Sequence, residues 1–166
     1  VSLGVSTRGD NGVIVSGDPG GDKDGITRRS LTLSGDYLLT DDLKLGFALR
    51  RSQEDYGLDS SSWSATTEEE YLVDSAYTSD RRATVGSVFA EYAMMDGRLT
   101  HRLSWQESKL DQRYTDPTYT NSVGHSEALK YRASFGLDGA VDGANQVISL
   151  MLDKQKDTNT LQAGVN

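Results

Sequence analysis

The chain has 166 residues, of which 36% are hydrophobic and 25% charged, and it carries a net charge of −8 and no cysteine. Without cysteine there is no disulfide scaffold, thiolate zinc site or thiol nucleophile, and a nucleic-acid partner is disfavoured because it would need clustered basic residues. No stretch approaches the roughly 18 apolar residues of a transmembrane helix. This composition does not exclude a membrane β-barrel, because the strands of such a barrel are only half apolar.

An alternation of apolar and polar residues predicts β-strands along most of the chain. From Leu31 to Leu39 the odd positions are apolar, aromatic or glycine, and the even positions up to Asp36 are polar, so the side chains divide between two faces. A helix would instead place apolar residues three and four positions apart. The alternation recurs at residues 43–49, 88–94, 99–105, 129–137 and 148–152, and partial strands are expected at 2–8 and 161–166.

Tight turns and long polar stretches alternate between these strands. Asp96-Gly97 is the strongest dipeptide signal for a two-residue hairpin turn, and Thr40-Asp41-Asp42 forms a second tight turn. A slightly longer turn with two glycines is expected at residues 139–144. Long polar loops are expected at residues 9–25, 57–81 and 115–126.

The expected strands are long. Those at residues 26–39 and 43–56 exceed the usual length of about 5–6 residues, and a tilted strand needs roughly 9–11 residues to cross a bilayer. Long strands with short turns at one end and long loops at the other are typical of an outer-membrane barrel. The expected fold class is all-β, an antiparallel up-and-down transmembrane barrel segment of about 6–8 strands, with residues 1–166 as a single segment. A soluble antiparallel sandwich or solenoid with one dry face would show the same alternation.

In such a barrel the apolar face meets lipid and the polar face lines the interior. The apolar faces of the three strongest strands carry no charge. Arg51, His101 and Glu107 also fall on the apolar face, but near strand ends, where a membrane interface tolerates charge. Aromatic girdles at the two interfaces are expected from Tyr37, Tyr92, Trp105 and Tyr131.

Residues 91–104, with the sequence EYAMMDGRLTHRLS, resemble a barrel hairpin of the TonB-dependent outer-membrane receptors, and the vitamin B12 and siderophore receptors are the nearest types. In that family a strand ends in a short Asp-Gly turn and the next strand begins Arg-Leu-Thr. Residues 38–49 and 129–152 resemble further hairpins of the same style. The resemblance extends over most of the chain.

The family has a barrel of about 22 strands that encloses an N-terminal plug, and a short N-terminal box contacts a TonB-type energising protein. Neither plug nor box is visible here, the first residues do not form a signal peptide and the last residue is not aromatic. The resemblance therefore implies an internal part of a receptor barrel in the bacterial outer membrane. The expected partners are outer-membrane lipid, the plug domain of the same receptor, the energising protein and a small-molecule ligand such as an iron-siderophore or cobalamin.

The long loops of such a receptor would face outward and capture the ligand. Loops commonly carry binding residues, and aromatic rings stack on a siderophore or corrinoid. The alternative is that these rings pack the loops against one another. The candidate ligand-binding residues are Tyr56, Trp63, Tyr71, Tyr77, Tyr114 and Tyr119.

An acidic, glycine-rich loop contains Asp18, Asp22 and Asp24. Clustered carboxylate oxygens suit Ca²⁺, and some B12-type receptors hold calcium in extracellular loops, so calcium is the one cofactor that we consider. The spacing matches no EF-hand, because the glycine and the distal glutamate are missing. The alternative is a solvated acidic loop without metal.

Charged residues of both signs are expected on the polar face, where they would face the lumen. They would hydrogen-bond the plug or guide the ligand. The alternative is that these charges form a ladder of cross-strand ion pairs and so neutralise one another within the wall. These residues are Arg28, Asp36, Lys44, Arg50, Glu91, Arg102, Lys130, Arg132, Asp138 and Asp153.

Catalysis is not expected. Residues 124–128, Gly-His-Ser-Glu-Ala, approach the GxSxG nucleophile elbow, but that motif needs a strand before the serine and a helix after it. His101 and His125, the only histidines, should lie at opposite ends of their strands. We therefore predict a non-enzymatic uptake receptor. The alternatives are a soluble or surface-attached β-rich binding or structural module and a passive porin-like channel.

Overall fold

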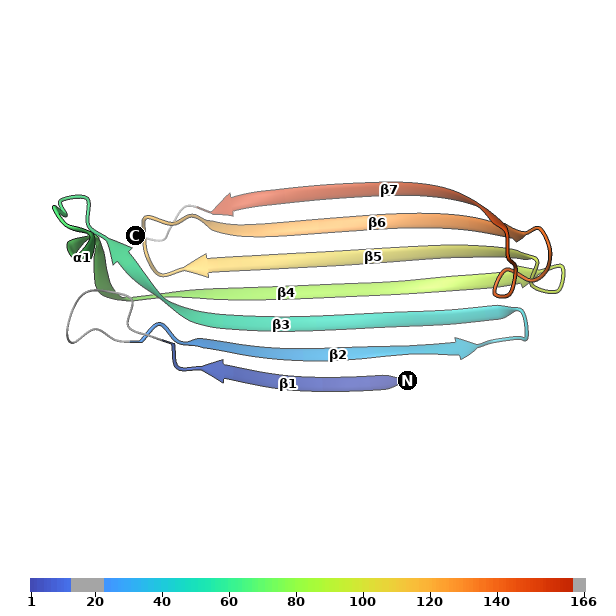
Figure 1. Ribbon diagram of the computed structural model, residues 1–166, viewed down its shortest axis with the longest axis horizontal. Coiled ribbons are helices and arrows are strands. Elements are labelled where there is room, and N and C mark those ends of the chain that lie inside the picture. The colour runs from blue at the N-terminus through green and yellow to red at the C-terminus, as the bar shows by residue number, and fades with distance from the viewer. Residues whose placement is uncertain (13–22, 163–166) are drawn as a thin grey trace.

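The computed structural model describes residues 1–12 and 23–162, and this part of the chain forms one antiparallel sheet. Its seven strands lie side by side in chain order, each hydrogen-bonded to the next, as Figure 1 shows. The expected class, all-β with up-and-down antiparallel strands, is confirmed. The elements are β1 (Ser2–Asp10), β2 (Ile26–Leu38), β3 (Leu43–Ser61), α1 (Glu68–Tyr71), β4 (Leu72–Met94), β5 (Leu99–Tyr114), β6 (Asn121–Gly136) and β7 (Val147–Gln162).

The strand register places the apolar residues of neighbouring strands opposite one another. Phe47 on β3 pairs with Val88 on β4, and Val88 pairs with Trp105 on β5. Trp105 pairs in turn with Leu129 on β6. Residues directly opposite in an antiparallel pair point to the same side of the sheet. One side of the whole sheet, the apolar face, therefore gathers the apolar alternates of every strand, and the other side, the polar face, gathers the polar ones.

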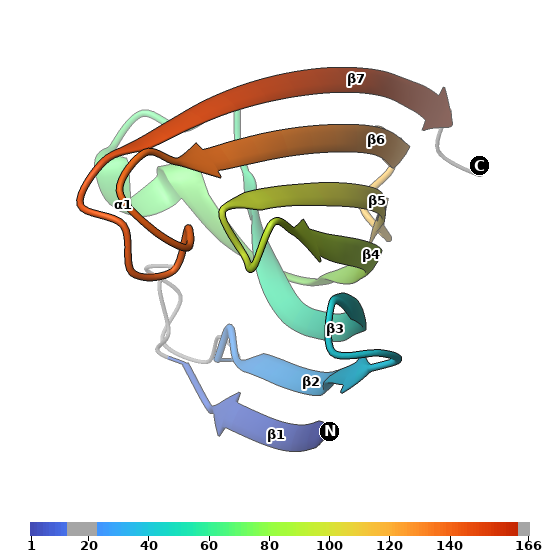
Figure 2. The same cartoon turned by 90° about the vertical axis from the view of Figure 1, so that its right-hand side faces the viewer.

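This apolar face is uncovered. Among the described residues, Ala128 is the one buried apolar residue, and it lies on the polar face. On the apolar face Leu103 is 50% exposed and Ile148 is 62% exposed. Figure 2 shows the sheet as a single twisted layer, with no second layer of strands or helices packed against it. The described part of the chain therefore has no hydrophobic core.

The apolar residues form a belt that ends along an oblique line. The first polar residue beyond it on the apolar face is Arg29 on β2 but Lys154 on β7. Lys154 pairs with Leu129 on β6. Successive pairs from strand to strand then show that the residue of β2 directly in line with Lys154, along the perpendicular to the strands, is Gly35. From Arg29 to Gly35 is six residues, about 20 Å, and β2 to β7 is five spacings of about 4.8 Å. The line is therefore inclined by about 40° to the perpendicular of the strands. It passes through Arg51, Thr84, Glu107 and Glu127 on β3 to β6.

Short turns join the strands at one end of the sheet. Asp96 and Gly97 have φ values of 56° and 81°, and the amide of Arg98 donates to the carbonyl of Met95 over 3.1 Å. Positive φ at both central residues is typical of a type I′ turn, so the tight turn predicted at Asp96-Gly97 is confirmed. Met95 also has a positive φ of 54°, and the strand pairing ends at Met94 and Leu99, so the turn lies within a loop of residues 95–98. In the turn before β3, the hydroxyl of Thr40 accepts from the amide of Leu43 over 3.0 Å.

The long loops are shorter than expected. Of the loop expected at residues 57–81, residues 57–61 belong to β3 and residues 72–81 to β4. Likewise β6 begins at Asn121, inside the loop expected at 115–126. These segments are mostly polar, and their few apolar residues, such as the adjacent Leu72 and Val73, do not alternate with polar ones. Their strand conformation is held by backbone hydrogen bonds to the neighbouring strand, which no side-chain pattern reports.

Three further expectations on element boundaries change. The partial strand expected at residues 161–166 is the end of β7, and residues 163–166 lie outside the described part. The turn between β6 and β7 runs from 137 to 146, which is longer than expected. Asp138 lies in this turn and not on the wall of the sheet. Its carboxylate accepts from the side-chain amide of Asn145 over 2.8 Å and from the backbone amide of Gln146 over 3.4 Å, so it links the two ends of the turn.

The two outer strands of the sheet, β1 and β7, each pair with a single neighbour, so the sheet is open. Among the residues that the structure describes, no helix is long and apolar enough to span a membrane.

The turn around Asp138 generates a prediction about pH. Hydrogen bonds from the Asn145 side chain and from backbone amides lower the pKa of Asp138. A lowered pKa means that the ionised carboxylate stabilises the fold above the unfolded value of about 3.9 and that this contribution is lost as the pH falls below it. We expect Asp138→Ala to lower the free energy of unfolding at pH 7 and to lose this difference below about pH 4.

Urea unfolding of the protein in detergent, which covers the exposed apolar face, measures this effect at several pH values. Asp142→Ala is the matched control and should leave the pH dependence unchanged, because Asp142 lies in the same turn and is likewise exposed, but among the described residues its carboxylate accepts none of the hydrogen bonds that Asp138 accepts. An equal effect of the two substitutions would contradict the role given to Asp138.

Candidate functional site

Ion pairs cross the polar face between neighbouring strands. Seven of the ten charges expected to face a lumen take part in them, and Glu54 adds an eighth. Arg50 and Arg132 share this face through their pairing with Thr32 and Arg102. Each cross-strand pair contributes roughly 0.2–1 kcal/mol. The pairs are Arg28 Nε–Glu54 Oε1 (2.8 Å), Lys44 Nζ–Asp36 Oδ2 (3.3 Å), Arg102 Nη1–Glu91 Oε2 (3.0 Å) and Lys130 Nζ–Asp153 Oδ2 (3.7 Å).

A stacked group, which the alternation does not predict, lies within this ladder. Phe89 occupies a polar-face position of β4, and its ring covers Gly46 on β3, where a Cβ atom would collide with it. The guanidinium carbon of Arg102 lies 3.7 Å from the centroid of the same ring. A glycine inside a strand marks a site of close approach, so Gly46 was the available signal. The stack orders Arg102 while its Nη1 also binds Glu91.

Three of the six candidate aromatic residues meet at the loop end of the polar face. Tyr56 ends the alternating part of β3, and Tyr114 is the last residue of β5. The side-chain amide of Gln112 lies between them and donates to both hydroxyl oxygens. Tyr119 stacks on Tyr114 with ring centroids 5.0 Å apart. Burial and the neighbouring Tyr56 hydroxyl raise the pKa of Tyr114. We call Tyr56, Gln112, Tyr114 and Tyr119 the tyrosine cluster.

The other three candidate aromatics lie apart from this cluster. Trp63 is 91% exposed in the loop between β3 and α1, and Tyr71 ends α1 and is 45% exposed. Tyr77 was expected in or beside a loop but lies within β4, opposite Leu58. The sequence therefore predicted the tyrosine cluster only in part, because pairing of β3, β4 and β5 decides which rings meet.

The calcium hypothesis falls largely outside the described residues. Asp18 and Asp22 lie in the segment 13–22, which the structure does not describe. Asp24 is described, and its carboxylate lies close to Gly57 at the start of the β3 extension. The hypothesis therefore stays a prediction.

The two histidines have separate partners. His101, on the apolar face near a short turn, has its Nδ1 2.6 Å from the hydroxyl of Tyr131. His125 lies near the loop end, with its Nε2 2.9 Å from Glu107. Residues 124–128 lie inside β6, so Ser126 is not on a strand-to-helix turn and forms no nucleophile elbow.

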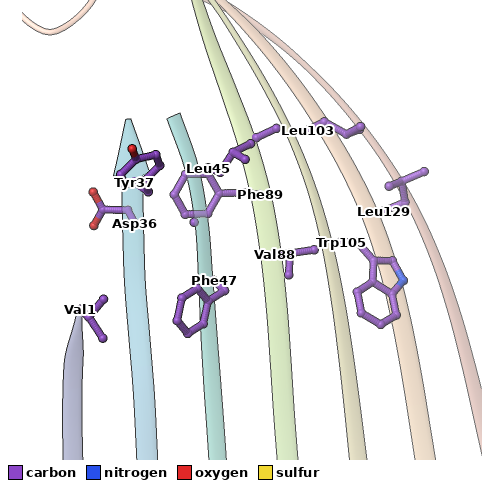
Figure 3. A pocket seen from close by; sticks show the side chains of 12 residues that line it. Val1, Asp36, Tyr37, Leu45, Phe47, Val88, Phe89, Leu103, Trp105 and Leu129 are labelled. Atoms are coloured by element: carbon purple, nitrogen blue, oxygen red, sulfur yellow. The ribbon is translucent and has the colours of Figure 1, made fainter. Parts of the chain in front are cut away.

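The apolar face itself has a shallow hollow of about 610 Å³. Figure 3 shows Phe47, Val88 and Trp105 side by side along it, from three successive strands. The hollow lies within the apolar belt and its lining is almost entirely hydrocarbon, so it is suited to apolar contact and not to polar ligands.

Comparison of the chain with models of protein families, with curated proteins and with solved structures gave no match.

The stack on Gly46 generates a prediction about stability. A methyl group at this position would displace the Phe89 ring and break its contact with Arg102, so Gly46→Ala should destabilise the fold by about 1–3 kcal/mol, as overpacking does. Gly86→Ala is the matched control, because its Cβ would lie 3.9 Å from Leu49, which is an ordinary contact. Urea unfolding of the two variants in detergent makes the comparison, and equal losses would show that the stack on Gly46 is unimportant.

Proposed function

We propose that this chain forms part of the wall of a β-barrel in the bacterial outer membrane. The observation that carries the proposal is the uncovered apolar belt on a sheet without a core. Moving one leucine side chain out of water is favourable by roughly 1.5–3 kcal/mol. Lipid would supply an apolar environment to the apolar residues of all strands at once. Further strands, paired to the free edges of β1 and β7, would close the wall.

The oblique boundary of the belt supports the same proposal. Strands of outer-membrane barrels are tilted by about 35–45° from the membrane normal. At a tilt of about 40°, the line from Arg29 to Lys154 runs parallel to the membrane plane. Charged residues of the apolar face would then begin at one height on all strands from β2 to β7 except β4, where an uncharged threonine stands, and this height is where the lipid headgroups start.

The wall, in this proposal, belongs to a TonB-dependent receptor that imports a scarce ligand such as an iron-siderophore or cobalamin. Two features support it: the resemblance of the β4–β5 hairpin to that family, and the tyrosine cluster on the polar face at the long-loop end. Loops and cluster capture the ligand, the ion-pair ladder faces the plug, and the energising protein pulls the plug to open a path. This mechanism involves no catalysis.

The first experiment compares the protein in plain buffer and in detergent by size-exclusion chromatography and far-ultraviolet circular dichroism. Aggregation in buffer and a β-rich, monodisperse species in detergent is the expected result, because the belt needs an apolar solvent. A β-rich monomer that is stable in plain buffer would reject the membrane location and favour a soluble β-rich module.

A substitution in the belt tests the orientation of the sheet. Leu45→Arg places a charge on the lipid side and should weaken membrane assembly by about 2–4 kcal/mol. Ala48→Arg, on the same strand but on the polar face and exposed, should have little effect. The folded fraction in lipid vesicles, read from heat-modifiable gel mobility, is the measurement. A similar loss for both variants would contradict the assignment of the two faces.

A second substitution tests the receptor assignment. Cyanocobalamin and a ferric hydroxamate siderophore serve as probes, and binding is followed by quenching of intrinsic fluorescence of the protein in detergent. Tyr114→Ala should weaken binding of the accepted probe several-fold, because an aromatic contact is worth about 0.5–1.5 kcal/mol. Tyr37→Ala, at the opposite end on the apolar face, is the control. Failure of both probes to bind would remove the receptor proposal and leave the membrane proposal standing.

A further inference from the structure

A histidine and two glutamates gather on the apolar face just beyond the belt. Glu107 comes from β5, and His125 and Glu127 come from β6. The Nε2 atom of His125 lies 2.9 Å from an oxygen of Glu107 and 3.9 Å from an oxygen of Glu127. One ligand atom from each of the three residues lies within 4.8 Å of the others. The three side chains are part-buried, with 34% of the His125 side chain and 45% of each glutamate side chain exposed.

The strand register brings these residues together and sets a charge problem. Glu107 and Glu127 are direct partners in the β5–β6 ladder, so their side chains leave the sheet next to each other. Like charges in directly opposite positions destabilise a sheet. His125, two residues from Glu127 on the same face, places its imidazole against both carboxylates. A positive charge is therefore favoured at the point where the three side chains converge.

The two nearest lysines do not occupy that point. Lys109 pairs with His125 and Lys156 pairs with Glu127, so both share the face. Among the described residues, however, neither lysine is within ion-pair distance of the two carboxylates, whereas His125 is. The lysines offset the negative charge from a distance and leave the convergence point itself open to a small cation.

We propose that Glu107, His125 and Glu127 form a binding site for a divalent transition-metal ion, with Zn²⁺ as the reference ion. Imidazole nitrogen and carboxylate oxygen are ligands that Zn²⁺ accepts at about 2.0–2.2 Å, which places tetrahedral ligand atoms about 3.3 Å apart. The observed separations of 2.9 and 3.9 Å bracket that value. Small rotations of the half-exposed carboxylates complete the geometry, and water takes the fourth position.

The site is independent of the proposed membrane location. The ion would link β5 to β6 and remove the repulsion between the facing carboxylates. If the sheet is a barrel wall, the ion lies at the level where the apolar belt ends. If the sheet is soluble, the same three residues still converge. Failure of the metal experiment therefore leaves the membrane proposal untouched, and the converse also holds.

The test uses the whole protein in detergent, freed of metal, and adds Zn²⁺ alone. Because the chain has only two histidines, each ring gives signals in the NMR spectrum that a single substitution assigns. Zn²⁺ is expected to shift the ring signals of His125 at one equivalent and to leave those of His101 unchanged. Calorimetric titration supplies the affinity.

Matched variants separate the site from other carboxylates of the chain. His125→Ala should weaken Zn²⁺ binding by at least about 10-fold, since one of three ligands is lost, and His101→Ala should leave it unchanged. Glu127→Gln keeps the size of the side chain and should also weaken binding, which covers the case in which His125→Ala does not fold. The proposal is overturned if Zn²⁺ binds without moving the His125 signals, if it does not bind, or if binding is equal in the parent protein and Glu127→Gln.

Discussion

The antiparallel register of seven neighbouring strands is the constraint on which the rest of this structure depends. Every direct pair puts two side chains on the same face, so an alternation that is local to each strand becomes a property of the whole sheet. Phe47, Val88, Trp105 and Leu129 form one continuous row because β3, β4, β5 and β6 pair without a shift at that level. The shift in the pairing of β3 with β4 lies further along, between Leu58 and Ser60. A slip of one residue would exchange the two faces of a strand.

The consequence is a sheet with one polar and one apolar face. The polar face satisfies its own charges through cross-strand ion pairs and through the stack of Arg102 on Phe89. The apolar face has no such internal partner, because the described part of the chain contains no second layer. In water, this uncovered apolar area is unfavourable roughly in proportion to its size. An apolar surrounding that covers the belt resolves this conflict, and it is the physical basis of the proposed membrane location.

The two groups of side chains proposed to bind a ligand or a metal ion both lie at the loop end of the sheet. The tyrosine cluster lies on the polar face, and the glutamate–histidine group lies on the apolar face just beyond the belt. Both depend on the pairing of β5 with its neighbours, since Tyr114, Gln112 and Glu107 all come from that strand. Binding and metal coordination would therefore be sensitive to the position of one strand, although they occur on opposite faces.

The sequence by itself determined the strands, their two faces and the tight turns, because alternation and the Asp-Gly turn are local properties of the chain. It also identified most of the charges of the polar face, since their positions follow from the same alternation, but it missed Glu54 and placed Asp138 on the wall although this residue lies in a turn. Three features were decided only by the tertiary structure. The polar extensions of β3 and β4 exist because backbone hydrogen bonds to neighbours hold them. The meeting of Tyr56 with Tyr114 and of His125 with Glu107 depends on which residues lie opposite in the ladder. The oblique boundary of the belt also emerges only when all strands are aligned. Each strand alone shows where its own apolar run ends, but the angle of the boundary depends on the register between neighbouring strands.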